Sequence, residues 1–174
     1  MVKKNVEAIW ADSKKVLNSL EQNAKENIDV IAKKCGFSRQ KVWRIIKYLE
    51  KEKLIWGYTA VADEEGKDLK HYVLLMNRTM VPLDEKMQKE VISKKLDWYL
   101  PDLVQIEDII ITHGKYDAMI TFYAPNLITA RKVIESLSRR IGKYIQEYVL
   151  LETLFPIRKH YLKNPEVKNL TTYI

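Results

Sequence analysis

The chain has 174 residues, 47% of them hydrophobic, and a formal net charge of +7 at pH 7. This length suits one typical domain or two small modules, and the apolar content excludes a disordered chain. No run approaches the roughly 18 apolar residues of a membrane span, the N-terminus lacks the apolar segment of a signal peptide, and one cysteine cannot build a disulfide framework or a zinc site. We therefore expect a cytoplasmic protein without membrane association, metal or cofactor.

The positive charge is concentrated at one end of the chain. Residues 1–62 contain 13 Lys or Arg and 7 Asp or Glu, whereas residues 63–174 contain 17 and 16. This asymmetry predicts a polyanion-binding module joined to a nearly neutral body.

Apolar spacing predicts three helices in the first module. The first covers about residues 3–22, and the second covers 28–35 and stops at Gly36. Ser38 fits the N-cap of a third helix at 39–52. The apolar positions of the first helix are Ile9, Val16, Leu17 and Leu20.

From residue 71 onward the pattern changes to alternating strands and helices. The order strand, helix, strand, strand, helix, strand is ferredoxin-like. Strands are predicted at 71–77, 104–112, 118–123 and 144–154, and helices at about 83–96 and from Asn126 to Gly142. The inner face of the last helix is predicted to be Leu127, Ala130, Ile134, Leu137 and Ile141.

These elements predict an α+β protein with two modules. Residues 1–62 form a (winged) helix-turn-helix domain that ends in an extended run, 54–61, and residues 63–70 form a linker. Residues 71–158 form the ferredoxin-like domain. For the tail, 159–174, two interpretations stay open: docking on a partner subunit, or loose order.

The third helix has two distinct faces. Ile45, Ile46 and Leu49 lie within about 60° of Val42 around the helix axis. The opposite side carries cations and an amide, which are groups that pair with phosphates and purine edges. This opposite side consists of Gln40, Arg44, Lys47 and Lys51.

A basic helix face is usually just solvated, but two features favour DNA contact. The turn from Cys35 to Ser38 has the length that joins helix-turn-helix pairs, and the charge excess is confined to this module. We expect double-stranded DNA as the partner, with phosphate contacts from Lys41, Lys47 and Lys51. The predicted DNA-binding residues are Ser38, Arg39, Gln40, Lys41, Trp43, Arg44, Lys47 and Lys51.

Several segments resemble one family in their order and spacing. They are Asp12, Val16–Leu17, Leu20, Asn23–Ala24, Ile31–Ala32, Gly36–Phe37–Ser38, Val42, Ile45 and Leu49–Glu50, followed by Leu54–Ala60 and the turn Gly114–Lys115–Tyr116–Asp117. The sequence thereby resembles the leucine-responsive regulatory protein/AsnC family of prokaryotic transcription regulators, also called feast/famine regulators.

The resemblance implies a sequence-specific DNA-binding regulator rather than an enzyme. It implies dimers formed through the second domain, which can assemble into octamers, and a small-molecule effector, usually an amino acid, bound between dimers. The implied effector-binding residues are Gly114, Tyr116 and Asp117, and we add Glu147 on the condition that it faces the same cavity. The start of the last strand departs from the family's small hydroxyl residues, so a regulator without an effector stays open.

Other constellations have simpler interpretations. His113 is expected to be a turn residue without a catalytic partner. Glu107 and Asp108 are expected to face opposite sides of a strand. Asp117 could accept an effector's amino group or stabilise its own turn.

The alternative function is that of an enzyme that resembles the siroheme decarboxylases and has the same two-domain architecture.

Overall fold

The computed structural model describes residues 2–63, 65–92 and 100–173, and it contains two compact units. Unit 1 consists of Met1–Val61 with Pro156–Ile174, and unit 2 consists of Ala62–Phe155. No helix within the described part of the chain is long and apolar enough to cross a membrane.

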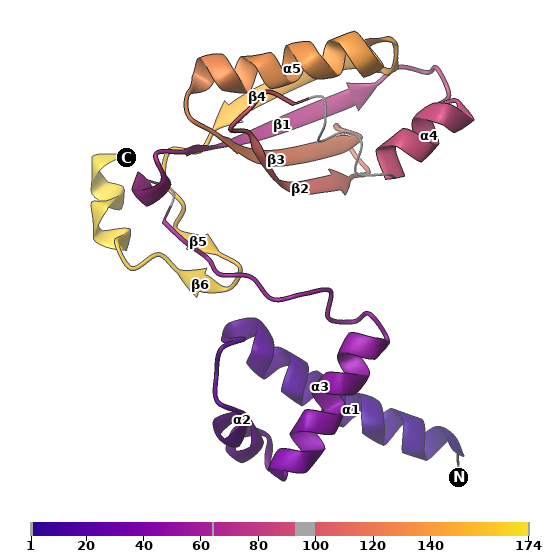
Figure 1. Ribbon diagram of the computed structural model, residues 1–174, viewed down its shortest axis with the longest axis vertical. Coiled ribbons are helices and arrows are strands. Elements are labelled where there is room, and N and C mark those ends of the chain that lie inside the picture. Colours follow the sequence, from indigo (N-terminus) through magenta and orange to yellow (C-terminus); the bar gives the residue numbers. More distant parts are fainter. Residues whose placement is uncertain (1, 64, 93–99, 174) are drawn as a thin grey trace. The chain divides into compact units, whose positions relative to one another are not determined.

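Unit 1 is built around three helices, α1 (Val2–Gln22), α2 (Ile28–Cys35) and α3 (Arg39–Lys51) (Figure 1). The ends of the short helices follow the predicted signals. Ser38 accepts a hydrogen bond from the Lys41 N–H, and Gly36 ends α2 in the left-handed region at φ 70°. The buried core consists of Val16, Leu20, Ile31, Ala32, Val42, Ile45 and Leu49.

One apolar position of α1 lies outside this core. Ile9 is 49% exposed, and the first buried residue among the described side chains of α1 is Ser13.

The extended run that was predicted after α3 does not pair as a β-strand with any described residue. The C-terminal part of unit 1 contains a two-stranded hairpin of β5 (Arg158–Lys159) and β6 (Leu162–Lys163), and the short helix η4 (Val167–Thr172).

Unit 2 has the ferredoxin-like order of elements that the sequence predicts. Its four-stranded sheet has the order β2-β3-β1-β4, and every neighbouring pair is antiparallel. The elements are η1 (Glu65–Lys67), β1 (Lys70–Arg78), α4 (Glu85–Ile92), β2 (Gln105–Ile111), β3 (Ala118–Ala124), α5 (Leu127–Ile141), η3 (Gly142–Tyr144) and β4 (Ile145–Glu152). The predicted helix residues 93–96 lie outside the described residues.

Helix α5 packs on one face of the sheet (Figure 1). Alternate residues of β1 and β3 are buried beneath it, as the period of a strand requires. Leu127 was predicted to face inward but is 47% exposed, because the side chain of a first helical residue tilts back beyond the packed turns. Val133 takes part in the core instead. The core side chains of α5 are Ala130, Val133, Ile134 and Leu137.

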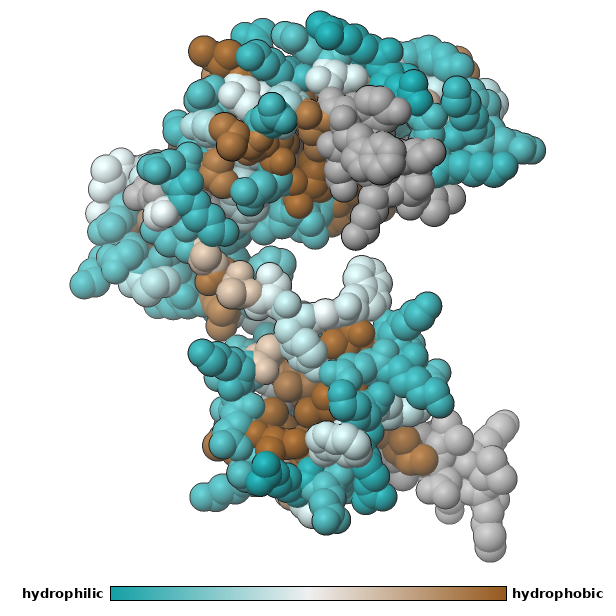
Figure 2. Space-filling view, in the orientation of Figure 1, coloured by the Kyte–Doolittle hydropathy of each residue, from teal (hydrophilic) through white to brown (hydrophobic). Residues whose placement is uncertain are grey.

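The opposite face of the sheet is apolar and accessible. Val73 and Leu75 of β1 lie on it, beside Met119 of β3 and Val149 of β4, and the neighbouring Leu151 is 48% exposed. Figure 2 shows hydrophobic side chains at the surface of unit 2 among hydrophilic ones.

Asp84 connects the start of α4 to the start of β4. Its Oδ1 accepts from the Met87 N–H at 2.8 Å and its Oδ2 accepts from the buried Tyr144 hydroxyl at 2.7 Å, with the Lys143 ammonium at 3.5 Å. These contacts, above all the Tyr144 hydrogen bond, lower the pKa of Asp84 to about 2.

We expect Asp84→Ala to lower the melting temperature at pH 7 by a few degrees. Since the pKa of Asp84 is lower in the folded protein than in the unfolded chain, its contribution is complete above about pH 4. It is lost as the pH falls through about 2, so the difference between wild type and variant should shrink over that range. Thermal unfolding followed by circular dichroism between pH 2 and 7 measures this, with Asp84→Asn as a control that keeps a capping oxygen. A difference that is constant down to pH 2 would contradict the assignment.

Candidate DNA-binding face and effector turn

Helix α3 has a fixed rotation, because Val42 and Leu49 are fully buried and Ile45 is 8% exposed. The outward side of α3 carries Gln40 and Arg44, both exposed, as the helical period dictates. The structure places every predicted DNA-binding residue on α3 or at its N-cap, and all of them except Lys41 are exposed.

Three of the predicted cations have an acidic partner. The Lys41 ammonium lies 2.6 Å from the Asp12 carboxylate of α1 and 4.0 Å from the Phe37 ring centroid. Lys41 therefore also joins α3 to α1, a contact that the sequence pattern does not indicate.

The partners of Arg39 and Lys47 lie on the surface of unit 1. Arg39 lies 3.6 Å from Asp29, and Lys47 donates to Glu50 at 2.8 Å. Tyr58, from the segment after α3, also donates its hydroxyl to Glu50 at 3.0 Å. The hydrogen bonds from Lys47 and then Tyr58 lower the pKa of Glu50. Exposed ion pairs contribute about 0–1 kcal/mol, so these cations can exchange partners at little cost.

Arg44 and Lys51 make no ion pair with any described residue. A guanidinium in this situation can donate two parallel hydrogen bonds to a guanine edge, and an ammonium can neutralise a phosphate. The Ser38 hydroxyl accepts from the Lys41 N–H at 3.3 Å and can donate its own proton to a phosphate oxygen.

A pocket of about 540 Å³ opens beside this face. Its lining combines two guanidinium groups with an indole and an aliphatic side chain. The residues are Ile28, Arg39, Gln40, Trp43 and Arg44. Ile28 was not a predicted site residue, and its only signal is an apolar side chain directly after the N-cap of α2.

The predicted effector residues lie at one end of the sheet in unit 2. Gly114, Tyr116 and Asp117 form the turn between β2 and β3, where Gly114 adopts φ 146°, a conformation that L side chains rarely adopt. Asp117 stabilises this end of the sheet, since its Oδ2 accepts from the Arg78 N–H at 2.8 Å.

Glu147 lies on β4, across β1 from that turn. Its Oε2 accepts from the Asn77 amide at 3.3 Å, so the carboxylates of Asp117 and Glu147 both contact residues 77–78 of β1. The structure thus gathers these two predicted carboxylates around one end of β1.

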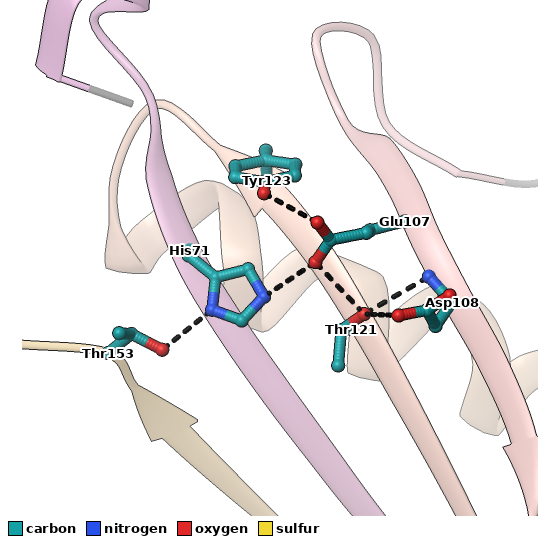
Figure 3. Close-up of polar contacts among 6 residues, drawn as sticks. All are labelled: His71, Glu107, Asp108, Thr121, Tyr123 and Thr153. Atoms are coloured by element: carbon teal, nitrogen blue, oxygen red, sulfur yellow. Dashed lines mark hydrogen bonds and ion pairs between the residues drawn. The ribbon is translucent and has the colours of Figure 1, made fainter. Parts of the chain in front are cut away.

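A polar network that the sequence does not indicate lies near the other end of β1 (Figure 3). The His71 ring nitrogens contact Thr153 Oγ1 at 2.6 Å and Glu107 Oε2 at 3.1 Å, and the Tyr123 hydroxyl donates to Glu107 at 2.8 Å. Six residues of β1, about 20 Å of strand, separate His71 from the end of β1 that contacts the turn between β2 and β3. The network links β1, β2 and β3 to Thr153, the residue that follows β4.

The expectation that Glu107 and Asp108 face opposite sides is wrong. A register shift between Ile106 and Asp108 interrupts the alternation of β2, and the Thr121 hydroxyl lies 3.4 Å from a carboxylate oxygen of each.

Known proteins resemble the chain along most of its length. Residues 13–55 match the winged helix-turn-helix DNA-binding family model. The leucine-responsive regulatory protein of Haemophilus influenzae is 27% identical over 155 residues, which cover 87% of this chain and 89% of that protein.

Solved structures share the fold at lower identity. The AsnC family transcriptional regulator from Agrobacterium tumefaciens is 18% identical and has a TM-score of 0.65, covering 85% of this chain and 92% of its own. A transcriptional regulator from Neisseria meningitidis, solved as a complex with L-Met, is 13% identical with a TM-score of 0.64, covering 85% and 91%.

The helix-turn-helix match and the basic outward side of α3 define a DNA-binding protein. The predicted resemblance to the leucine-responsive regulatory protein/AsnC family is confirmed, and the protein is a DNA-binding transcription regulator with the architecture of that family.

Arg44→Ala and Lys51→Ala should have different effects on DNA binding. We expect Arg44→Ala to relax the base preference at one position of the DNA site and to cost about 1–3 kcal/mol there. Lys51→Ala should weaken binding to all sequences alike and reduce the slope of log affinity against log salt by about 1.

Fluorescence anisotropy on duplexes selected from a random pool, at several salt concentrations, measures both effects. Arg158→Ala, an exposed cation in the C-terminal part of unit 1, is the control for the loss of one positive charge. Unchanged affinity and preference in Arg44→Ala would show that this face does not enter a groove.

Proposed function

We propose that the protein binds a pseudo-palindromic operator as a symmetric dimer. Helix α3 of each subunit enters one of two successive major grooves, whose centres are about 34–36 Å apart. The observation that carries this proposal is the set of exposed groups on α3, in which Gln40 and Arg44 read bases while Lys47 and Lys51 neutralise phosphates. Lys41 adds a phosphate contact only by leaving Asp12, so its main role is to hold α3 on α1.

The accessible face of the sheet in unit 2 supports the dimer. A sheet is stable when both its apolar faces are covered, and α5 covers only one of them here. Val73, Leu75, Met119 and Val149 form a continuous apolar surface on the other face, which is the kind of surface that two copies bury against each other.

We expect Leu151→Lys to convert the dimer into a monomer. Leu151 lies opposite Val73 on this face and is half-exposed, so the new charge would be buried only in the dimer. Sedimentation equilibrium measures the mass of the variant. The variant should still bind a duplex with one half-site, but it should lose the higher affinity that the dimer has for a duplex with two half-sites.

The control for this variant is Ile128→Lys, on an exposed position of α5. It should remain a dimer. A dimeric Leu151→Lys would show that the subunits associate elsewhere.

We further propose that an amino acid binds near the turn between β2 and β3 and modulates the assembly of dimers. The free backbone at Gly114 can approach a carboxylate, and Asp117 can accept an α-amino group. Tyr116 lies in the same turn. Glu147 adds a second negative charge, which favours a cationic side chain such as that of lysine or arginine.

A thermal-shift screen of the twenty amino acids tests this proposal. A ligand at 100 times its dissociation constant stabilises the folded protein by about 2.7 kcal/mol, so lysine or arginine should raise the melting temperature by several degrees. Glu147→Gln should remove their advantage, and it leaves the Asp117 turn intact. A response to leucine alone would reject the charge argument, and no response to any amino acid would support a regulator without an effector.

A further inference from the structure

We propose that the pocket beside α3 receives the 5-methyl group of a thymine in each operator half-site, and that Trp43 determines this specificity. The inference deepens the proposed DNA-binding function and rests on it. It assigns a base and a chemical contact to a pocket in the groove-facing surface.

The pocket has a mixed wall that suits a base edge better than a phosphate alone. Ile28 approaches from the first position of α2, and Trp43 approaches from the second turn of α3. Arg39, Gln40 and Arg44 complete the lining. Cations attract a polyanion to this place, whereas an indole and an isoleucine provide a surface that gains free energy by contact with an apolar group.

Trp43 is 55% exposed, which leaves much of a large aromatic surface in contact with water. The exposed part of this indole is available to an apolar group of a ligand. Among the base edges in the major groove, thymine alone presents a methyl group, while the other edges present donors and acceptors. The major groove of DNA therefore offers one apolar group, the thymine methyl, that matches the apolar wall of the pocket.

The same lining indicates which bases lie next to the thymine. Arg44 pairs with guanine O6 and N7, and Gln40 pairs with adenine N6 and N7. Both side chains border the pocket, so the thymine lies beside a purine read by one of them. The half-site then contains a thymine next to a guanine or an adenine.

Replacement of thymine by deoxyuridine tests the contact without altering the protein. Deoxyuridine keeps the base pair and its hydrogen-bonding edge and removes only the methyl group. On a duplex selected from a random pool, we expect one thymine per half-site at which this replacement weakens binding about fourfold, the factor for burying one methyl group. Replacements at the other thymines should change affinity less than twofold.

Two variants then locate the contact in the protein. Trp43→Ala should bind the thymine and deoxyuridine duplexes equally. Tyr48→Ala removes an aromatic side chain of similar exposure (43%) that does not line the pocket, and it should keep the full fourfold difference. Circular dichroism spectra of both variants verify that α3 is intact.

Two results would overturn the pocket assignment while leaving the regulator intact. In the first, no thymine is sensitive to loss of its methyl group although the protein selects a defined operator. In the second, the fourfold difference persists in Trp43→Ala. A protein that selects no sequence from the random pool would instead contradict the proposed operator recognition itself.

Discussion

The burial of Val42, Ile45 and Leu49 is the constraint on which the rest of the DNA-binding unit depends. Each fully buried aliphatic side chain contributes about 1.5–3 kcal/mol, whereas an exposed ion pair on the same helix contributes about 0–1 kcal/mol. The apolar contacts therefore decide the rotation of α3, and the charged side chains face outward as a consequence. Phosphates can then replace the weak surface partners of Arg39 and Lys47 without disturbing the core.

Unit 2 separates stability from recognition in a similar way. The face of the sheet beneath α5 forms the core, with Phe122 and Tyr72 fully buried, and the other face is accessible and is the surface proposed for dimer contact. The two ends of β1 have different polar chemistry. His71 and Glu107 brace the strands at one end, whereas Asp117 and Glu147 gather negative charge at the other.

The sequence predicts the elements well because their signals are local. Helical spacing, the N-cap Ser38 and the C-terminal Gly36 suffice to place α2 and α3, and short apolar runs next to turn residues suffice to place β1 and β3. Contacts between segments far apart in sequence have no local signal. The pairing of Lys41 with Asp12 and the position of Ile28 in the pocket beside α3 become visible only when the helices are packed. The register shift between Ile106 and Asp108 likewise has no signal in the sequence of β2, because it depends on the pairing of β2 with β3.

Methylation of the bound operator by dimethyl sulfate tests the central claim, that α3 lies in the major groove, most directly. The reagent modifies guanine N7 in the major groove and adenine N3 in the minor groove. With α3 placed as described, guanine N7 should be protected in two patches about one helical turn apart, and adenine N3 within those patches should stay reactive. Protection of adenine N3 with fully reactive guanine N7 would contradict the account.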